Sequence, residues 1–188
     1  DHPKNAEQLA KFQAALSHMP HANNGARASL ANSSGAFLGA EYHFDQIRPG
    51  AALYGVNPTP NAPNPMTQVV RLQGKILQVR AIDTPHSVGY GATYKPQGRA
   101  RIATIAAGYA DGYHRTLSNA GTVYVGEHKA SVVGRVSMDL ITIDVTHVPE
   151  ELTHPGQLVD LIGPHNPVDQ VGADAGTIGY EILTGLGA

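Results

Sequence analysis

Apolar residues recur with a helical period near the start of the chain and with a two-residue period over much of its later part. Leu9, Phe12 and Leu16 are spaced as on one face of a helix. This spacing predicts an amphipathic helix that begins at Asn5 and ends at Leu16. Asn5 followed by Gln8 resembles a capping box in its first turn.

Two short apolar segments follow, residues 28–33 and 47–54, and both end in small residues as buried strands do. A helix, a strand, a short connection and a second strand are typical of parallel βα units. Residues 57–65 then contain four prolines, and a segment of this composition cannot continue a helix or a sheet. It is the best candidate for a linker.

After this segment the pattern becomes that of an antiparallel β-domain. Segments rich in Val, Ile and Thr predict about seven strands or more, at residues 69–72, 75–82, 101–107, 122–125, 130–136, 140–145 and 158–162. Turn signals separate them, at Gly74, Gly126-Glu127, Pro155-Gly156 and Gly163-Pro164. We expect a closing helix near residues 177–184.

The composition narrows the class of protein. Of the 188 residues 41% are apolar and 15% charged, enough to bury a core and unlike a disordered chain. Thirteen Lys and Arg against fifteen Asp and Glu give a net charge of −2, which argues against a polybasic binder of nucleic acid or of anionic membranes. Cysteine is absent, which excludes disulfides, thiolate metal sites and a cysteine nucleophile and fits a cytoplasmic protein.

The sequence shows neither a membrane-targeting segment nor a metal-binding motif. No apolar run approaches the roughly 18 residues of a membrane span, and no signal-peptide core opens the chain. The ten histidines include no pair at H-x-H, H-x-x-x-H or H-E-x-x-H spacing, so no metal site is expected. Asp160, Asp169 and Asp174 are interpreted as turn or cap residues.

The first 55 residues are short for the fold that they predict. A complete (β/α)₈ barrel takes about 250 residues, so they could supply only its last one or two units. Two parallel strands buried on both faces are not a plausible free-standing sheet. We therefore expect the missing part of the barrel to precede Asp1. The predicted fold class is α/β plus all-β, with residues 1–65 as the C-terminal end of a (β/α)₈ barrel and residues 66–188 as an antiparallel β-domain.

Six short motifs carry a more specific signal. Four of them place glycine beside tyrosine, arginine or methionine, namely IRPGAALYG at residues 47–55, VGYGATY at 88–94, GYADGY at 108–113 and GRVSMD at 134–139. The motif ANSS at 31–34 precedes them, and GYE at 179–181 follows them. Any one motif is weak, but the order and approximate spacing of all six are similar to those in the second half of the alanine racemase family.

The resemblance implies a pyridoxal-phosphate (PLP) isomerase that interconverts L- and D-alanine and supplies D-alanine for the peptidoglycan of the cell wall. The family joins a (β/α)₈ barrel to a C-terminal β-domain and works as a homodimer, in which the β-domain of one subunit completes the active site of the other. Its Schiff-base lysine lies on an early barrel strand, and none of the five lysines of this chain ends a predicted barrel strand. The chain alone is therefore expected to be inactive.

By the same resemblance five residues bind the cofactor. Ser33 ends a predicted parallel strand and offers its hydroxyl to the phosphate. Gly50 and Ala51 offer unobstructed backbone N–H groups, and Tyr180 offers a second hydroxyl near the start of the closing helix. Arg48 donates to the pyridine nitrogen of PLP. Because a guanidinium keeps its protons, that nitrogen stays unprotonated and the cofactor is a weaker electron sink.

The resemblance assigns proton transfer and substrate binding to the β-domain. Tyr90 matches the tyrosine that contacts the substrate and acts as acid or base on one face of its α-carbon, opposite the lysine. A free phenol is a poor base at neutral pH, so cationic neighbours must stabilise its phenolate. Met138 matches a methionine whose backbone N–H meets the substrate carboxylate, next to Ser137, where many relatives have cysteine. Tyr109 is expected to line the entrance channel, with Asp111 holding its loop.

Two alternative functions fit the same residues. A racemase of broader specificity would act on serine or basic amino acids, and the size of the pocket around Tyr90, Tyr109 and Met138 would distinguish it. A non-catalytic β-domain that mediates association or binds a ligand would show no PLP-dependent complementation by an N-terminal half.

Overall fold

The computed structural model describes residues 2–19 and 25–187. The chain forms two compact units, Asp1–Val69 and Val70–Ala188, and each is described by itself. The first unit contains, in order, α1 (Pro3–His18), the 3₁₀ helices Gly35–Phe37 and Ala40–Tyr42, and α2 (Gly50–Leu53). Residues 57–65 contain no helix or strand, as predicted.

Helix α1 confirms the predicted helix but begins earlier than expected. Its N-cap is His2, whose Nδ1 accepts a hydrogen bond from the Lys4 N–H at 3.2 Å, and a proline fills the next position, where its missing N–H costs nothing. The predicted capping box is therefore wrong, because Asn5 lies inside the helix. Phe12 of the helical stripe meets Phe44 edge to face, with ring centroids 4.9 Å apart.

The prediction of two strands in the first unit is wrong, because neither segment forms a strand. The two segments do run parallel where they meet. An isolated parallel bridge joins Asn32 to Arg48, and the Arg48 N–H donates to the Ala31 carbonyl at 2.9 Å. Beyond it the chain turns at Pro49 into helix α2. Two short segments have no further strand among the described residues to pair with, and an isolated pair is marginal.

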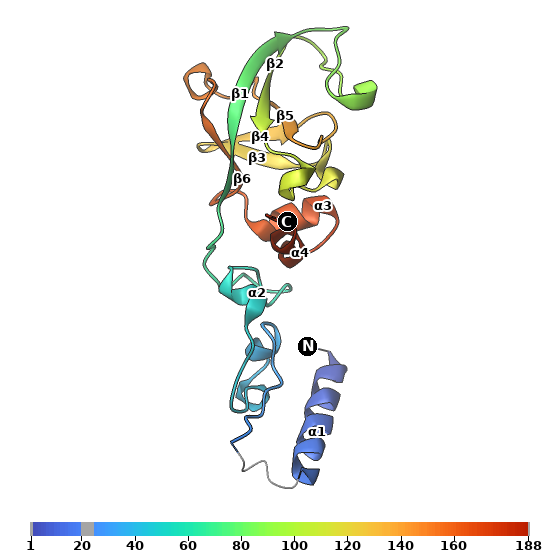
Figure 1. Ribbon diagram of the computed structural model, residues 1–188, viewed down its shortest axis with the longest axis vertical. Coiled ribbons are helices and arrows are strands. Elements are labelled where there is room, and N and C mark those ends of the chain that lie inside the picture. The colour runs from blue at the N-terminus through green and yellow to red at the C-terminus, as the bar shows by residue number, and fades with distance from the viewer. Residues whose placement is uncertain (1, 20–24, 188) are drawn as a thin grey trace. The chain divides into compact units, whose positions relative to one another are not determined.

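The second unit contains a closed antiparallel barrel followed by two helices (Figure 1). Its strands are β1 (Leu72–Ile82), β2 (Ala100–Ala106), β3 (Thr122–Val125), β4 (His128–Val132), β5 (Leu140–Asp144) and β6 (Leu158–Ile162). In the described part of the unit they neighbour one another in the order β1-β2-β5-β4-β3-β6, and β6 also pairs with β1. The remaining helices are α3 (Val168–Ala175), α4 (Gly179–Thr184) and the 3₁₀ helices Tyr90–Ala92, Tyr109–Asp111, Arg115–Leu117 and Glu150–Leu152.

The barrel core follows from the two-residue period of the strands. In β5, Ile141 and Ile143 point inward and are fully buried, whereas Leu140 remains partly exposed. Burial of each such side chain contributes about 1.5–3 kcal/mol. The largest fully buried side chains come from every strand and from the loops between them, including Ile76, Ile105, Val123, Val125, Val132, Ile141, Ile143, Leu161 and Ile162.

The prediction of a turn at Gly74 is wrong, because Gly74 lies within strand β1. The strand runs unbroken through this residue from Leu72 to Ile82 and includes the predicted segment 75–82, whereas residues 69–71 of the other predicted segment lie outside it, so the described barrel has six strands rather than seven. A Cβ at Gly74 would lie 2.5 Å from Cγ2 of Ile105, so this glycine makes room for β2. Irregularities between Leu72 and Gln73 and between Ile76 and Gln78 bend the strand between its two partners.

Helices α3 and α4 follow β6 in the chain and lie side by side (Figure 1). Helix α4 confirms the predicted closing helix, although it begins at Gly179. Helix α3 was not predicted, because it has only eight residues. Its buried positions, Val168, Val171 and Gly172, are too few for a helical spacing of apolar residues to be recognised in the sequence.

Candidate functional site

Residues 134–139 form an irregular segment between β4 and β5 on which two loops of the second unit rest, and we call it the support segment. The turn before β3 holds its backbone. Asn119 Oδ1 accepts a hydrogen bond from the Gly134 N–H at 2.6 Å, and Ser118 Oγ accepts one from the Val136 N–H at 3.0 Å. Sequence reasoning did not single out these two turn residues.

Tyr90 lies in a loop whose base is closed by the antiparallel bridge between Val88 and Tyr94. The loop contacts the support segment through Gly89, which has a φ of +76°. A Cβ on Gly89 would lie 2.9 Å from the Arg135 nitrogen, so only glycine allows this approach. Tyr90 itself is 72% exposed and therefore free to face a ligand.

Tyr109 and Met138 are brought together by backbone hydrogen bonds. The Tyr109 N–H donates to the Ser137 carbonyl at 3.0 Å, and the Ala110 N–H donates to the Met138 carbonyl at 2.9 Å. Both large side chains remain exposed, Met138 at 54% and Tyr109 at 42%. The support segment thus connects three of the residues that the motifs identified.

Glycines make the closest contacts of the Tyr109 loop. A Cβ on Gly108 would lie 2.1 Å from the Met138 carbonyl oxygen, and one on Gly112 would lie 2.2 Å from the Gly185 carbonyl oxygen. Asp111 holds the loop as predicted, because its Oδ2 accepts a hydrogen bond from the Gly108 N–H at 2.9 Å. The loop therefore joins the support segment to the end of α4.

An open depression of about 450 Å³ lies beside Tyr90. Its wall includes Arg135, Ser137 and Leu140, together with polar side chains of β1, β2 and β5. Arg135 supplies the positive charge of this wall, and its Cζ would lie 3.7 Å from a Cβ on Gly91. Sequence reasoning quoted the motif of Arg135 without giving it a role, although a cation was expected near the phenol.

Tyr180 is the second residue of α4 and is 38% exposed. Its helix crosses α3 at close range, since a Cβ on Gly172 would lie 2.6 Å from the Gly179 nitrogen. The position of the tyrosine therefore depends on the small residues at this crossing.

In the first unit the structure brings Ser33 next to α2. Ser33 is 7% exposed, and its Oγ accepts a hydrogen bond from the Ala52 N–H at 3.0 Å. The hydroxyl proton of Ser33 remains available for an acceptor. Gly50 and Ala51 form the first turn of the same helix, so all three predicted phosphate ligands of this unit are close together. The Gly50 N–H is not free as expected, because it donates to a backbone carbonyl.

Arg48 is held beside this group by its backbone bridge and by its guanidinium. Nη1 donates to the Ser29 carbonyl at 3.0 Å and to the Ser29 Oγ at 2.6 Å, and Nη2 donates to the Leu30 carbonyl at 3.3 Å. A guanidinium carries five N–H donors, so further donors remain after these bonds. The Gly50 N–H donates to the Arg48 carbonyl at 3.0 Å, which links Arg48 to the predicted phosphate ligands of this unit.

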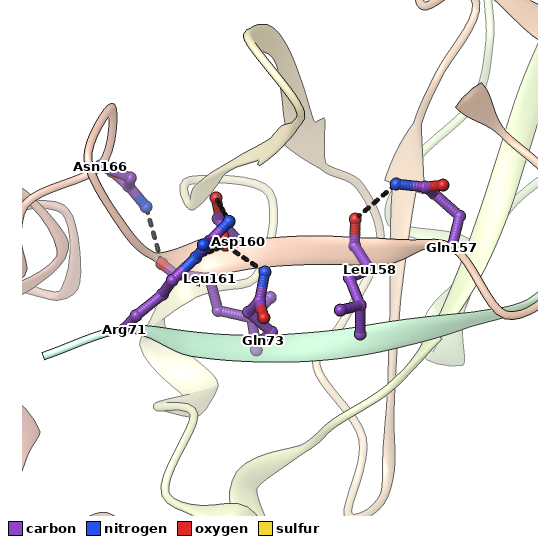
Figure 2. Close-up of polar contacts among 7 residues, drawn as sticks. All are labelled: Arg71, Gln73, Gln157, Leu158, Asp160, Leu161 and Asn166. Carbon is purple, nitrogen blue, oxygen red and sulfur yellow. Dashed lines mark hydrogen bonds and ion pairs between the residues drawn. The ribbon is translucent and has the colours of Figure 1, made fainter.

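An ion pair between a buried carboxylate and an exposed arginine belongs to the barrel wall rather than to the site. Asp160 of β6 is 5% exposed and accepts hydrogen bonds from Arg71 Nε at 2.8 Å and from Gln73 Nε2 at 2.7 Å (Figure 2). Hydrogen bonding to this carboxylate, and its charge, raise the pKa of Arg71. The expectation that Asp160 is a turn residue is wrong, because it lies inside a strand and ties it to β1.

Two other tyrosines have structural roles. Burial raises the pKa of Tyr113 far above its usual value, and the charge of Asp174 adds to this. The hydroxyl of Tyr113 is buried and has no hydrogen-bond partner among the described residues. Tyr94 has a raised pKa because of burial and of its hydrogen bond to Asp144 Oδ2 at 3.0 Å. Both phenols therefore stay protonated through neutral pH.

The described ranges hold neither a cluster of metal ligands nor a membrane-spanning helix. Residues 2–19 and 25–187 contain no group of three or more His, Asp or Glu side chains placed to hold a metal ion. Within the same ranges, every helix is too short or too polar to cross a bilayer.

Models of known families match both parts of the chain. The alanine racemase N-terminal domain matches residues 1–58, and the alanine racemase C-terminal domain matches residues 69–188. The alanine racemase of Rhodospirillum rubrum is 57% identical over 188 residues, which are all of this chain and 49% of that protein. The alanine racemase of Rickettsia bellii is 47% identical and is covered to 45%. The chain thus spans about half the length of the curated relatives it matches.

Solved structures agree with these matches. Alanine racemase from Bartonella henselae, with covalently bound pyridoxal phosphate, shares 44% identity with a TM-score of 0.90 over all of this chain and 51% of that one. The biosynthetic alanine racemase from Pseudomonas aeruginosa shares 36% identity with a TM-score of 0.88, again over all of this chain and 51% of the other. On both sequence and structure, this chain belongs to the alanine racemase family.

Proposed function

We propose that this chain forms part of a PLP-dependent isomerase that interconverts L- and D-alanine. The observation that carries the proposal is the support segment, which connects Tyr90, Tyr109 and Met138 while all three side chains remain exposed. The 57% identity with an alanine racemase over the whole chain supports alanine as the substrate. In a bacterium such an enzyme supplies D-alanine for peptidoglycan.

The donors of the first unit suit a phosphorylated cofactor. The Ser33 hydroxyl has a proton left to donate, and the backbone N–H groups of Gly50 and Ala51 lie in the adjoining first turn of α2. The Gly50 N–H donates to the Arg48 carbonyl at 3.0 Å and would exchange this bond for one to the phosphate. These three, with the hydroxyl of Tyr180, would hold the phosphate of PLP, and Arg48 would donate to the pyridine nitrogen. When bound, PLP withdraws electrons from the α-carbon of an amino acid and so makes its proton removable.

The residues of the second unit would then handle the substrate. The hydroxyl oxygen of Tyr90 takes or returns the α-proton on one face, and Arg135 contributes positive charge to the same wall. The backbone N–H of Met138 binds the substrate carboxylate, and Tyr109 lines the entrance. A lysine on the opposite face, contributed by a barrel strand that these residues do not include, completes the pair of acid–base groups.

We also propose a dimeric assembly and a cytoplasmic location for the enzyme. The active enzyme is a homodimer with shared active sites, in which Tyr90 serves the site of the partner subunit. It requires an N-terminal barrel portion in addition to these residues, and it works in the cytoplasm. The absence of cysteine is compatible with that compartment.

Two alternatives remain as outcomes of the test. A racemase of broader specificity would turn over serine or basic amino acids at rates comparable with alanine. A non-catalytic β-domain would bind or associate without turnover.

The test uses a chimeric enzyme, in which the part of the Rhodospirillum rubrum alanine racemase that lies before its match to this chain is joined to Asp1. With PLP, the chimeric enzyme should racemise alanine faster than serine, lysine or arginine. Tyr90→Phe keeps the ring and removes the proton-transferring hydroxyl. Deuterium incorporation at the α-carbon should then collapse from L-alanine and survive from D-alanine, because the lysine still acts on its own face. Equal loss from both enantiomers would refute the role of Tyr90.

A further inference from the structure

The loop of Tyr90 has little internal structure to fix the position of its phenol. It is closed by the Val88–Tyr94 bridge at its base and contains a single 3₁₀ turn, in which the Ala92 N–H donates to the Gly89 carbonyl at 3.2 Å, and Tyr90 is mostly exposed. Gly91 and Ala92 both have positive φ values, +73° and +51°, so the backbone next to Tyr90 turns sharply. Contacts from outside the loop must therefore position the phenol.

Asn119 contacts both the Tyr90 loop and the support segment. Its Oδ1 accepts a hydrogen bond from the Gly134 N–H at 2.6 Å, and its Nδ2 donates to the Oγ1 of Thr93 at 3.3 Å. Thr93 lies three residues after Tyr90 in the same loop, and Gly134 begins the support segment. One side-chain amide thus bridges the Tyr90 loop and its support.

The orientation of this amide follows from its partners. A backbone N–H can only donate, so the oxygen of Asn119 must face Gly134 and the nitrogen must face Thr93. The backbone of Asn119 has a φ of +56°. Asparagine tolerates this conformation better than most residues, whereas a residue with a bulkier or branched side chain would strain the turn.

We propose that Asn119 is a positioning residue for Tyr90. The amide holds the Tyr90 loop against the support segment, so that the phenol oxygen stays at one distance from the substrate position and from Arg135. This inference rests on the proton-transfer role proposed for Tyr90. It predicts that loss of the bridge affects the reaction on the face of Tyr90 more than on the opposite face.

Two variants of the chimeric enzyme distinguish loss of the Asn119 hydrogen bonds from a change in the conformation of the turn that contains Asn119. Asn119→Gly removes both hydrogen bonds and keeps a residue that accepts positive φ without strain. Thr93→Val removes only the hydroxyl at the far end of the bridge and keeps the side-chain shape. Asn166→Ala is the matched control, because the Asn166 amide donates to the carbonyls of Thr122 and Leu161 in the barrel and touches neither loop (Figure 2 shows its bond to Leu161).

The readout is the rate of deuterium incorporation at the α-carbon, measured from each enantiomer. Asn119→Gly should slow incorporation from L-alanine about 10- to 100-fold and from D-alanine less than about threefold, because small misplacement of a reacting group costs rates of this order. Thr93→Val should shift the same ratio in the same direction, and adding it to Asn119→Gly should change little further, since both remove one bridge. Asn166→Ala should lower both rates equally.

The outcomes distinguish this inference from the function on which it rests. If Tyr90→Phe gives the asymmetric loss but Asn119→Gly and Thr93→Val slow both directions equally or leave both unchanged, the positioning role is refuted and the function stands. If Tyr90→Phe itself gives a symmetric loss, the proton-transfer role fails and the positioning role fails with it.

Discussion

Replacement of Gly108 by alanine tests whether the Tyr109 loop must touch the support segment. The backbone of Gly108 is extended, with φ −155° and ψ −165°, so alanine fits the conformation without strain. The added Cβ would lie 2.1 Å from the Met138 carbonyl oxygen and 2.5 Å from the Asp139 nitrogen, where an ordinary contact begins at 3.4 Å. Because these atoms are backbone, the two segments must separate by about 1 Å or more.

A separation of this size affects two hydrogen bonds directly. The bonds from the Tyr109 N–H to Ser137 and from the Ala110 N–H to Met138, at 3.0 and 2.9 Å, would lengthen beyond the normal range. Each contributes about 0.5–1.5 kcal/mol net, and an added methyl in a tight contact costs about 1–3 kcal/mol. We expect Gly108→Ala to lower the free energy of unfolding by about 2–4 kcal/mol.

The assay compares Gly108→Ala with Gly98→Ala in the chimeric enzyme. A Cβ on Gly98 would meet no atom within 4 Å, so this control should change stability by less than about 0.5 kcal/mol. Urea unfolding followed by circular dichroism gives the stability, and initial rates give KM for alanine, which should rise because the Met138 N–H moves. If Gly108→Ala matches Gly98→Ala in both measurements, the contact does not position the site.

Three further predictions concern the remaining unusual groups. Tyr113→Phe removes a buried hydroxyl that has no partner among the described residues, so the free energy of unfolding in urea should rise by about 1 kcal/mol, and a decrease would contradict this. Since the pKa of Tyr94 is raised above 10.0, its contribution to stability is complete below that pH and is lost as the pH rises through the raised value. Tyr94→Phe should therefore flatten the fall of the melting temperature above pH 10, and an equally steep fall would exclude this role. Arg48→Glu should protonate the pyridine nitrogen of bound PLP and increase transamination relative to racemisation, measured as pyruvate formed per turnover, and an unchanged ratio would remove Arg48 from that role.

The strands of the second unit could be predicted because each follows a local rule. Alternation of Val and Ile with polar residues predicted β3, β5 and β6 within one or two residues. Turn residues at Gly126-Glu127 marked the β3–β4 connection in the same way. These elements are short, and the residues that determine each of them lie within a few positions of one another in the sequence.

Elements that depend on distant contacts could not be predicted in this way. Gly74 has the composition of a turn, but its small size serves the approach of Ile105, about thirty residues later, within one continuous strand. Residues 47–54 are as apolar as a strand, yet they lack strands to pair with in the described chain, and Pro49 directs them into α2.

The candidate site likewise combines features that the sequence predicts with features that depend on distant contacts. The motifs identified Tyr90, Tyr109 and Met138, because glycines beside large side chains are rare in regular strands. They did not indicate that one segment supports all three, since that depends on backbone contacts between residues far apart in the sequence. Asn119 carried no sequence signal beyond a turn composition, and only its two hydrogen bonds connect it to the Tyr90 loop and the support segment.

Backbone contacts explain how the second unit can hold the side chains of the candidate site in place without burying them. A side chain that packs in a core is well positioned but cannot meet a substrate, whereas an exposed side chain on a free loop is accessible but poorly positioned. Gly89 and Gly108 resolve this conflict, because they let the loop backbones lie directly on the support segment while Tyr90, Tyr109 and Met138 point outward. Substitutions at these glycines should therefore impair catalysis without changing any side chain that touches the substrate, which distinguishes a positioning defect from loss of a chemical group.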